Sequence, residues 1–487
     1  MKNIFKYKFP ILVAVLFMTA TSCNDGLTDL NVDPNNPVEV PAVNLVSQAQ
    51  WALHNRLWSR GYNAEWSMLM VQHWAQNEYA EESRYTVDGN DFDIEWLDIY
   101  AGTGTSSGGV LINLETAAST IEEDASVNAK TKANQLAIIK VLKAHAYHNL
   151  TDAYGDIPFS QALNSVEYSL PAYDSQETVY GEILKMLDEA ATAMDASAGS
   201  FGSGDLIFGG DVAAWKRTAY SLMMRVAMRM VDVDQATATE FIQKAAGNMI
   251  TSNSENALFV FSDNPSLANP LYVDASINNR DDFAVTKFLV DNLTDMGDPR
   301  LQVFADTNNV GNIVGMPYGL TDGEAFALKS TTSRPSTRVR SAQDPAIIID
   351  YAEVMFMAAE AFQRGILTGD AAEAYAEGVK ASMNYWGIDD DAAIADYVAA
   401  NPYDASNWKK SIGWQKWIAF YMNGPQAWAE WRRLDFPQLA VPVAATNPSI
   451  PVRLPYPISE QTRNATSLGV VTQSPDDLNA KLWWDVN

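Results

Sequence analysis

The sequence is poor in the residues that build cross-links and metal sites. It has one cysteine, Cys23, and four histidines in 487 residues. A single cysteine excludes a disulfide within the chain, so stability must come from packing. His145 and His148 are spaced i and i+3, but no second cysteine or clustered carboxylate completes a metal shell around them. The motifs HExxH and GxxxxGK[ST] are also missing. We therefore expect no cofactor, no metal site and a structural role for both histidines.

Basic residues are scarce as well. The chain has 33 Lys and Arg against 60 Asp and Glu, which gives a net charge of -27. Such a surface repels nucleic acid and anionic lipid, so neither is expected as a partner. The composition is nevertheless that of a folded protein, because 47% of the residues are hydrophobic and 11% are aromatic.

The one long apolar run lies at the N-terminus. Three lysines precede the run Ile11–Met18, and small residues separate it from Cys23. This order is typical of a lipoprotein signal peptide, and the run is too short to span a bilayer, which needs about 20 residues. We predict a signal peptide at 1–22, a lipidated Cys23 that anchors the protein to the membrane, and a tether at 23–41. An ordinary secretory signal with an incidental cysteine is the alternative. Without residues 1–22, 30 basic residues face 60 acidic ones, a net charge of -30.

Helical periodicity dominates the rest of the chain. Apolar residues recur every three or four positions over Asn128–Tyr154, and Gly155 follows as a stop signal. Other helices are predicted to begin at a capping box of Asp174 and Glu177, at Asp211, at Asp344-Pro345 and at Asp370. Strand-like alternation is rare. The sequence therefore predicts a mainly α fold of irregular tetratricopeptide-like helix pairs, an α-α superhelix, in one domain over residues 42–487.

Two segments lack this periodicity, residues 77–92 and 262–340. Long irregular segments inside a folded domain are usually functional or poorly ordered. Aromatic side chains on such loops can hold sugars, with the ring under the CH face and polar neighbours for the hydroxyls. Trp215, Tyr375 and Trp386 lie on apolar stripes and are expected in the core. The ligand-binding candidates are instead Trp74, Tyr79, Arg84 and Tyr85 from the first segment and Tyr272, Asn278 and Arg280 from the second.

Several stretches together resemble the SusD/RagB family of surface lipoproteins from Bacteroidota. They are LNVDPNNP at 30–37, AIIKVLKAHAYHNLTDAYGDIPFSQAL at 137–163, RDDFAVTKFLVDNLTDMGDPRL at 280–301, IGWQKWIAFYMNGPQAWAEWRRLDFP at 412–437 and IPVRLPYPISEQTRN at 450–464. The resemblance spans essentially the whole mature chain and is strongest to the SusD-like subgroup.

The resemblance implies four irregular tetratricopeptide-like helix pairs that support a loop-rich face. It further implies a protein of the outer membrane's extracellular side that captures oligosaccharides, or peptides, without catalysis, as the lid of a TonB-dependent, SusC-like transporter. Binding residues do not transfer from the family, so the candidates above rest on the loops alone. The competing function is a secreted all-helical polysaccharide-degrading enzyme, which would need two carboxylates about 5–9 Å apart in a cleft.

Overall fold

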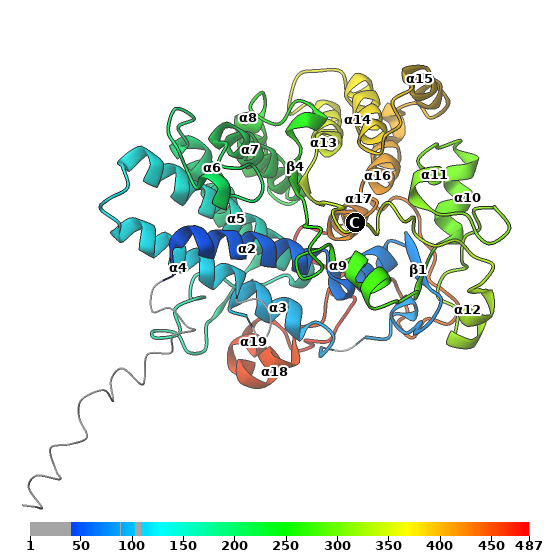
Figure 1. The fold of residues 1–487 in the computed structure, drawn as a ribbon, viewed down its shortest axis with the longest axis horizontal. Coiled ribbons are helices and arrows are strands. Elements are labelled where there is room, and N and C mark those ends of the chain that lie inside the picture. Colours follow the sequence, from blue (N-terminus) through cyan, green and yellow to red (C-terminus); the bar gives the residue numbers. More distant parts are fainter. Residues whose placement is uncertain (1–39, 88, 103–108, 487) are drawn as a thin grey trace, which may run out of the picture.

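Helices that follow one another in the chain pack side by side through the first half of the fold. The computed structural model describes residues 40–87, 89–102 and 109–486. In the left half of Figure 1, α4 packs on α2 and α5, α6 on α5 and α7, and α8 on α7. The helices of this half are α2 (Ala42–Leu57), α3 (Asp93–Tyr100), α4 (Val110–Glu123), α5 (Ala129–Tyr154), α6 (Gln176–Ala193), α7 (Val212–Arg229) and α8 (Gln235–Ala245).

A second group of helices continues the same arrangement. Helix α13 packs on both α14 and α16, and it also touches α7, so it joins the two groups. The group consists of α13 (Tyr351–Gln363), α14 (Ala371–Tyr385), α15 (Asp391–Ala400), α16 (Trp408–Ala419) and α17 (Gly424–Leu434). Two later short helices, α18 (Ile458–Arg463) and α19 (Ala465–Val471), pack on each other and lie below α3 in Figure 1. The predicted mainly α fold of helix pairs is confirmed.

Short elements fill the space between and beside the long helices. Within the described residues, the strands form three two-stranded antiparallel sheets. They are β1 (Trp74–Gln76) with β5 (Phe283–Val285), β2 (Ile157–Pro158) with β3 (Tyr173–Asp174), and β4 (Ala257–Phe259) with β6 (Ala346–Ile349). The short helical turns are η2 (Arg60–Met68), η3 (Glu82–Arg84), η4 (Gly202–Gly204), η5 (Asn253–Glu255), α9 (Pro270–Tyr272), η6 (Val273–Ile277), α10 (Lys287–Asp295), α11 (Leu301–Phe304), α12 (Asp322–Leu328) and η7 (Ala405–Asn407).

The N-cap residues show which of the predicted helix starts are correct. Asn128, Asp211 and Asp370 each accept a hydrogen bond from the first turn, as predicted. The predicted box at Asp174 is wrong: Ser175 caps α6, and the Asp174 carboxylate instead accepts the backbone N–H groups of the turn after β2.

The predicted start at Asp344-Pro345 is also wrong. Residues 346–349 form the buried strand β6, and α13 begins only after Asp350, whose carboxylate accepts the N–H of Glu353 at 2.8 Å. Three consecutive isoleucines favour a buried strand, and a short apolar run of this kind has no periodicity that separates strand from helix.

Tryptophans are among the largest side chains in the core. Trp58, Trp66, Trp74, Trp215, Trp417, Trp428 and Trp484 are among the largest side chains with less than 2% exposure. Trp215, Tyr375 and Trp386 are buried, as predicted. His145 and His148 are also buried, and burial is the main cause that lowers the pKa of His148 to about 3. Both histidines are therefore neutral core residues at neutral pH.

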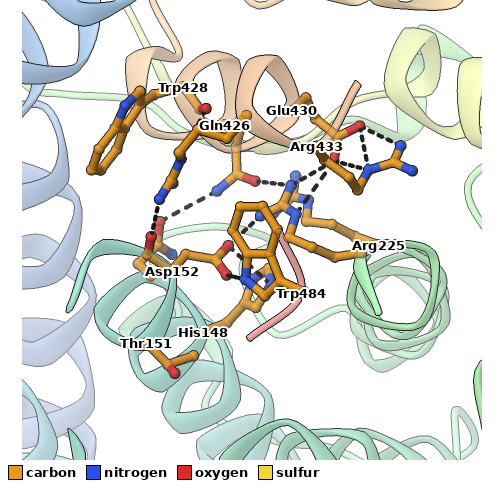
Figure 2. A network of polar contacts seen from close by, with 12 residues as sticks. His148, Thr151, Asp152, Arg225, Gln426, Trp428, Glu430, Arg433 and Trp484 are labelled. Carbon is orange, nitrogen blue, oxygen red and sulfur yellow. Dashed lines mark hydrogen bonds and ion pairs between the residues drawn. The ribbon is translucent and has the colours of Figure 1, made fainter. Parts of the chain in front are cut away.

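A buried network of charges connects the helices at the centre of the molecule (Figure 2). Glu430 of α17 contacts Lys416 at 2.6 Å, Arg433 at 2.7 Å and Arg229 at 3.0 Å. Arg433 also pairs with Glu360 of α13 at 2.6 Å. Burial alone would raise the pKa of Glu430, but the three cations outweigh it and hold this pKa well below its usual range. The charged residues of the EWRR stretch are thus structural.

The C-terminal segment is attached to the same network. The indole of Trp484 donates to Asp152 of α5 at 3.1 Å, and Arg229 forms an ion pair with Asp152. Arg432 stacks on Trp428 with its guanidinium carbon 3.6 Å from the ring centre, and it donates to the backbone oxygen of Asp152 at 2.9 Å. One carboxylate on α5 therefore holds α7 and the end of the chain together.

The predicted signal peptide, Cys23, nearly all of the tether and most of the glycine-rich run 102–109 lie outside the described residues. Within those residues, no helix has the length and hydropathy needed to cross a bilayer.

Candidate functional site

The two irregular segments meet in space. Strand β1 precedes the first segment and β5 lies within the second, and the two strands pair with Trp74 opposite Val285 and Gln76 opposite Phe283. The pairing continues one residue further, because the N–H of Asn77 donates to the oxygen of Asp282 at 2.8 Å. Residues about two hundred positions apart in the sequence are thereby joined at the right side of Figure 1, near α12.

Tyr79 stands out on this surface. Its side chain is 61% exposed, and its backbone has a φ of 54°, a conformation that is uncommon for a residue other than glycine. The guanidinium of Arg280 lies over the ring at 5.1 Å, a cation–π contact. Arg280 is in turn held by Asp282 at 2.5 Å. The aromatic ring is therefore kept open to solvent and fixed from one side.

A polar hollow of about 530 Å³ is lined by Asp281, the residue after Arg280, and by Lys329, which contacts Glu78, the residue before Tyr79. Phe326 of α12 is 62% exposed at its wall. Lys329 crosses from Glu78 at 2.9 Å to Asp281 at 3.7 Å, and Arg334 holds Asp281 at 2.5 Å. The lining residues are Asp281, Thr307, Asn308, Asn309, Phe326, Lys329, Ser330, Thr332 and Arg334. We call this hollow, with Glu78, Tyr79 and Arg280, the Tyr79 face.

Each cation that we name on the Tyr79 face has a carboxylate partner. Arg280 pairs with Asp282, Lys329 with Glu78, and Arg334 with Asp281. Burial tends to raise the pKa of Asp281, but Arg334 and Lys329 outweigh it and leave this pKa below its ordinary value. The carboxylate is thus ionised at neutral pH, and the face offers paired charges, amides and hydroxyls around two exposed aromatic rings.

Arg60 of η2 forms ion pairs with residues that flank this face. It contacts Glu65 and Asp274 at 2.6 Å and Asp282 at 2.8 Å, and its guanidinium carbon lies 4.9 Å from the centre of the Phe283 ring. Burial, only partly offset by Arg60, raises the pKa of Glu65 to about 7. One arginine therefore fixes the segment that carries Arg280 onto η2.

The N-terminal turn of helix α12 is fixed to the first irregular segment, residues 77–92. Asp322 accepts the N–H of Ala80 at 2.7 Å and lies 3.6 Å from Arg84. Thr321 and Glu324 form a capping box, so the first turn is well defined. This contact holds α12, which carries Phe326 and Lys329, against the segment that contains Tyr79.

The predicted site residues fall into two groups. Tyr79, Arg280 and Asn278 are exposed, and Tyr272 and Arg84 are partly buried. Trp74 and Tyr85 are only 1% and 2% exposed. The Trp74 indole donates to the hydroxyl of Tyr421 at 2.9 Å, and the Tyr85 ring packs against Tyr318. The predicted stacking of Trp74 and Tyr85 on a ligand therefore finds no support in this geometry, because both rings are part of the core beneath the face.

Phe326, Lys329, Arg334, Asn308 and Asn309 were not among the predicted residues, although they lie in the segment 262–340. A signal existed for Phe326, since it is a single aromatic residue within the polar stretch TDGEAFALKSTT. In the described part of the chain, no group of three or more His, Cys, Asp or Glu side chains could hold a metal ion.

Comparison with known proteins identifies the family of this helical chain. Residues 34–457 match the model of the SusD-like family described as "Starch-binding associating with outer membrane". The chain belongs to this family. No curated protein matches the sequence.

Several solved structures are similar to the whole domain. One is a chitin-binding protein with 27% sequence identity and a TM-score of 0.80, covering 92% of this chain and 100% of that chain. A SusD-like protein named Bacteroidetes AC2a has 24% identity and a TM-score of 0.78, with the same coverage. A chitin-binding SusD homolog from Flavobacterium johnsoniae has 23% identity and a TM-score of 0.77, covering 91% and 99% of the two chains. The last two show likeness of fold.

Proposed function

We propose that this protein is a cell-surface lipoprotein that captures oligosaccharides on the Tyr79 face. The observation that carries the proposal is Tyr79 itself, an exposed ring held in an uncommon backbone conformation beside Arg280. Strained residues persist where the surrounding structure fixes them, and they cluster at binding sites. The family description and the chitin-binding relative support a glycan as ligand. A peptide is the other ligand class to test.

The chemistry of the face favours a neutral sugar chain. Tyr79 and Phe326 supply two rings for CH faces, and the amides of Asn308 and Asn309 can bind hydroxyl groups. The cations of the face are already neutralised, so a polyanionic glycan would gain little. On an open surface we expect dissociation constants from about 1 μM to 1 mM, or about -8 to -4 kcal/mol.

We also propose that Cys23 carries the lipid and that the protein acts as the lid of a TonB-dependent outer-membrane transporter. A captured ligand gains entry only through a gated barrel, so the Tyr79 face would have to open toward that partner. A permanent complex of this kind buries about 2,000–5,000 Å². The mature charge is -30, from 30 basic and 60 acidic residues, so an interface that involves the acidic surface needs basic patches or cations on the partner.

The protein is proposed to bind without catalysis. A general acid near neutral pH needs a raised pKa, whereas that of Asp281 in the hollow is lowered. Ser106 lies in the sequence GTSSG, which fits the G-x-S-x-G pattern of serine hydrolases. That motif needs a strand before it and a helix after it, but here helix α3 precedes it. A polysaccharide-degrading enzyme therefore remains only the competing outcome of the test.

Calorimetry against neutral oligosaccharides and a peptide mixture tests the ligand. We expect a neutral oligosaccharide to bind, and Tyr79→Ala and Phe326→Ala each to weaken it at least tenfold, about 1.4 kcal/mol. Leu206→Ala, at a 44% exposed apolar side chain on η4's loop, is the matched control and should bind like the wild type. Unchanged affinity in both ring variants would place the site elsewhere.

Purification of the tagged protein from native outer membranes tests the partner. A barrel recovered in near-equal amount supports the lid. Recovery of the protein alone, together with depolymerisation of a polysaccharide, would favour the enzyme.

A further inference from the structure

A second pocket lies away from the Tyr79 face, between α10, α16 and the turn after α15. Its volume is about 390 Å³, within the range of small-ligand sites, about 300–1,000 Å³. It is lined by Asn292, Met296, Tyr375, Asn401, Pro402, Asp404, Asn407, Lys410, Ser411, Trp414 and Gln415. We propose that this pocket, the Trp414 pocket, binds one or two units of a neutral saccharide.

The base of the pocket is rigid. Gln415 is 1% exposed, and its amide donates to the hydroxyl of Tyr397 at 2.9 Å while its oxygen accepts from Arg300 at 3.0 Å. The buried Arg300 is paired with Asp298 at 2.6 Å. Tyr375 is also buried, and its hydroxyl donates to the backbone oxygen of Asn401 at 3.0 Å. The pocket is thus built on side chains whose own hydrogen bonds hold them in place.

The walls combine one aromatic ring with neutral hydrogen-bonding groups. Phe288 stacks on the partly buried Trp414 with the ring centres 5.8 Å apart and an angle of 14°, which fixes the indole. The side-chain amide of Asn292 donates to the oxygen of Phe288 at 2.8 Å, and that of Asn401 donates to the oxygen of Tyr397 at 3.0 Å. Each amide oxygen is left as an acceptor. An indole beside oriented acceptors suits a ring that carries CH groups and hydroxyls.

Charge argues for a neutral ligand. The two charged residues of the lining, Asp404 and Lys410, are exposed and opposite in sign. Asp404 already accepts the N–H and the hydroxyl of Ser406 at 2.9 and 2.6 Å. Exposed charges contribute little to binding in water, and the more deeply placed groups are all uncharged. Nothing in the pocket therefore favours an ionic ligand over a neutral one.

The Trp414 pocket and the Tyr79 face are built partly from neighbouring segments of the chain. Helix α10, which supplies Asn292, begins directly after β5, and β5 directly follows the stretch that carries Arg280 and Asp281 of the Tyr79 face. A long glycan held at both sites would bind with a gain from effective concentration rather than from new contacts. This use rests on the proposed function of the Tyr79 face, whereas the affinity of the pocket for a sugar does not.

Fluorine NMR of protein labelled with 5-fluorotryptophan tests the pocket, with Trp414→Phe to assign the Trp414 signal. Maltose, cellobiose and di-N-acetylchitobiose at about 10 mM, ten times a 1 mM constant, are the probes. We expect at least one sugar to shift the Trp414 signal, and the shift to persist in Tyr79→Ala. Asn292→Leu should weaken this binding at least tenfold.

The control is Asn248→Leu, because the Asn248 amide also donates to the oxygen four residues before it, at 3.4 Å, but on a remote surface. No movement of the Trp414 signal with any of the three sugars would overturn the proposal. Equal affinities in the Asn292→Leu and Asn248→Leu variants would also overturn it, as would movement with lysine or glutamate alone. Failure of Tyr79→Ala to weaken oligosaccharide binding in calorimetry would contradict the Tyr79 face and leave the Trp414 result standing.

Discussion

Removal of the charge on Glu430 tests how the buried network holds the helices together. In Glu430→Gln the side chain keeps its shape, but Arg229, Lys416 and Arg433 lose a shared partner. These three cations lie 2.6 to 3.0 Å from the carboxylate, and their side chains are at most 2% exposed. Arg229 keeps its ion pair with Asp152, and Arg433 keeps its ion pair with Glu360. The variant therefore leaves Lys416 as a buried cation without its carboxylate.

The expected cost follows from the geometry. One pair of charges at 3 Å gains roughly 5 kcal/mol at an effective dielectric constant of about 20. Breaking a buried pair costs about 3–5 kcal/mol, and the glutamine oxygen keeps part of the hydrogen bonding. We expect a loss of about 3–5 kcal/mol, against a total stability of about 5–15 kcal/mol for a typical domain.

Urea denaturation of the two proteins measures this loss at pH 7. Glu189→Gln is the control, because Glu189 pairs with Lys140 at 2.7 Å but both side chains are more than 40% exposed. That surface pair should be worth less than about 1 kcal/mol. Near-ultraviolet circular dichroism checks that each variant is folded before denaturation. Equal midpoints for Glu430→Gln and Glu189→Gln would refute the structural role of the network.

The pH dependence of the loss gives a second check. The cations hold the pKa of Glu430 well below that of an unfolded glutamate, about 4.3. Its contribution is therefore complete above pH 4.3 and declines as the pH falls toward the folded pKa. The difference in the free energy of unfolding between wild type and Glu430→Gln should therefore become smaller in acid.

Three further predictions concern other parts of the chain. Burial raises the pKa of Asp350 to about 7, so the folded state keeps a proton that the unfolded chain releases between about pH 4 and 7. The contribution of Asp350 to the free energy of unfolding therefore falls as the pH rises from about 4 to about 7. Asp350→Asn, which can still cap α13, should flatten the fall in urea midpoints measured at pH 5 and 7.5. Gly378→Ala would place a methyl group 2.8 Å from the Phe356 ring and should lower stability by about 1–3 kcal/mol. Gly181→Ala, which meets open space on α6, should instead raise the urea midpoint. Cys23→Ala should release a folded protein from membranes on fractionation, and membrane retention that resists salt washing would contradict lipidation.

Local signals predicted the long helices well. Asn128 before a periodic run and Gly155 after it mark α5, because an N-cap and a stop leave few other conformations. Residues 346–349 show where local sequence signals fail to predict the secondary structure. Their isoleucines fit a helix or a strand equally, and pairing with β4, nearly ninety residues away, decides for the strand.

The candidate site was predictable in outline only. The absence of periodicity located both irregular segments, and composition pointed to Tyr79 and Arg280. The burial of Trp74 depends on Tyr421, which lies 347 positions later in the sequence. Phe326 lies at the wall of the hollow on α12, and Asp322 of that helix accepts a hydrogen bond from Ala80, more than two hundred positions earlier in the sequence. Such long-range contacts decide which aromatic rings are core and which are exposed, and no local pattern records them.

A crystal structure of the protein with a neutral oligosaccharide that binds in calorimetry tests the central claim most directly. We expect a sugar ring over Tyr79 and further units in the hollow between Phe326 and Arg334. An oligosaccharide bound elsewhere, with the Tyr79 face empty, would contradict the account.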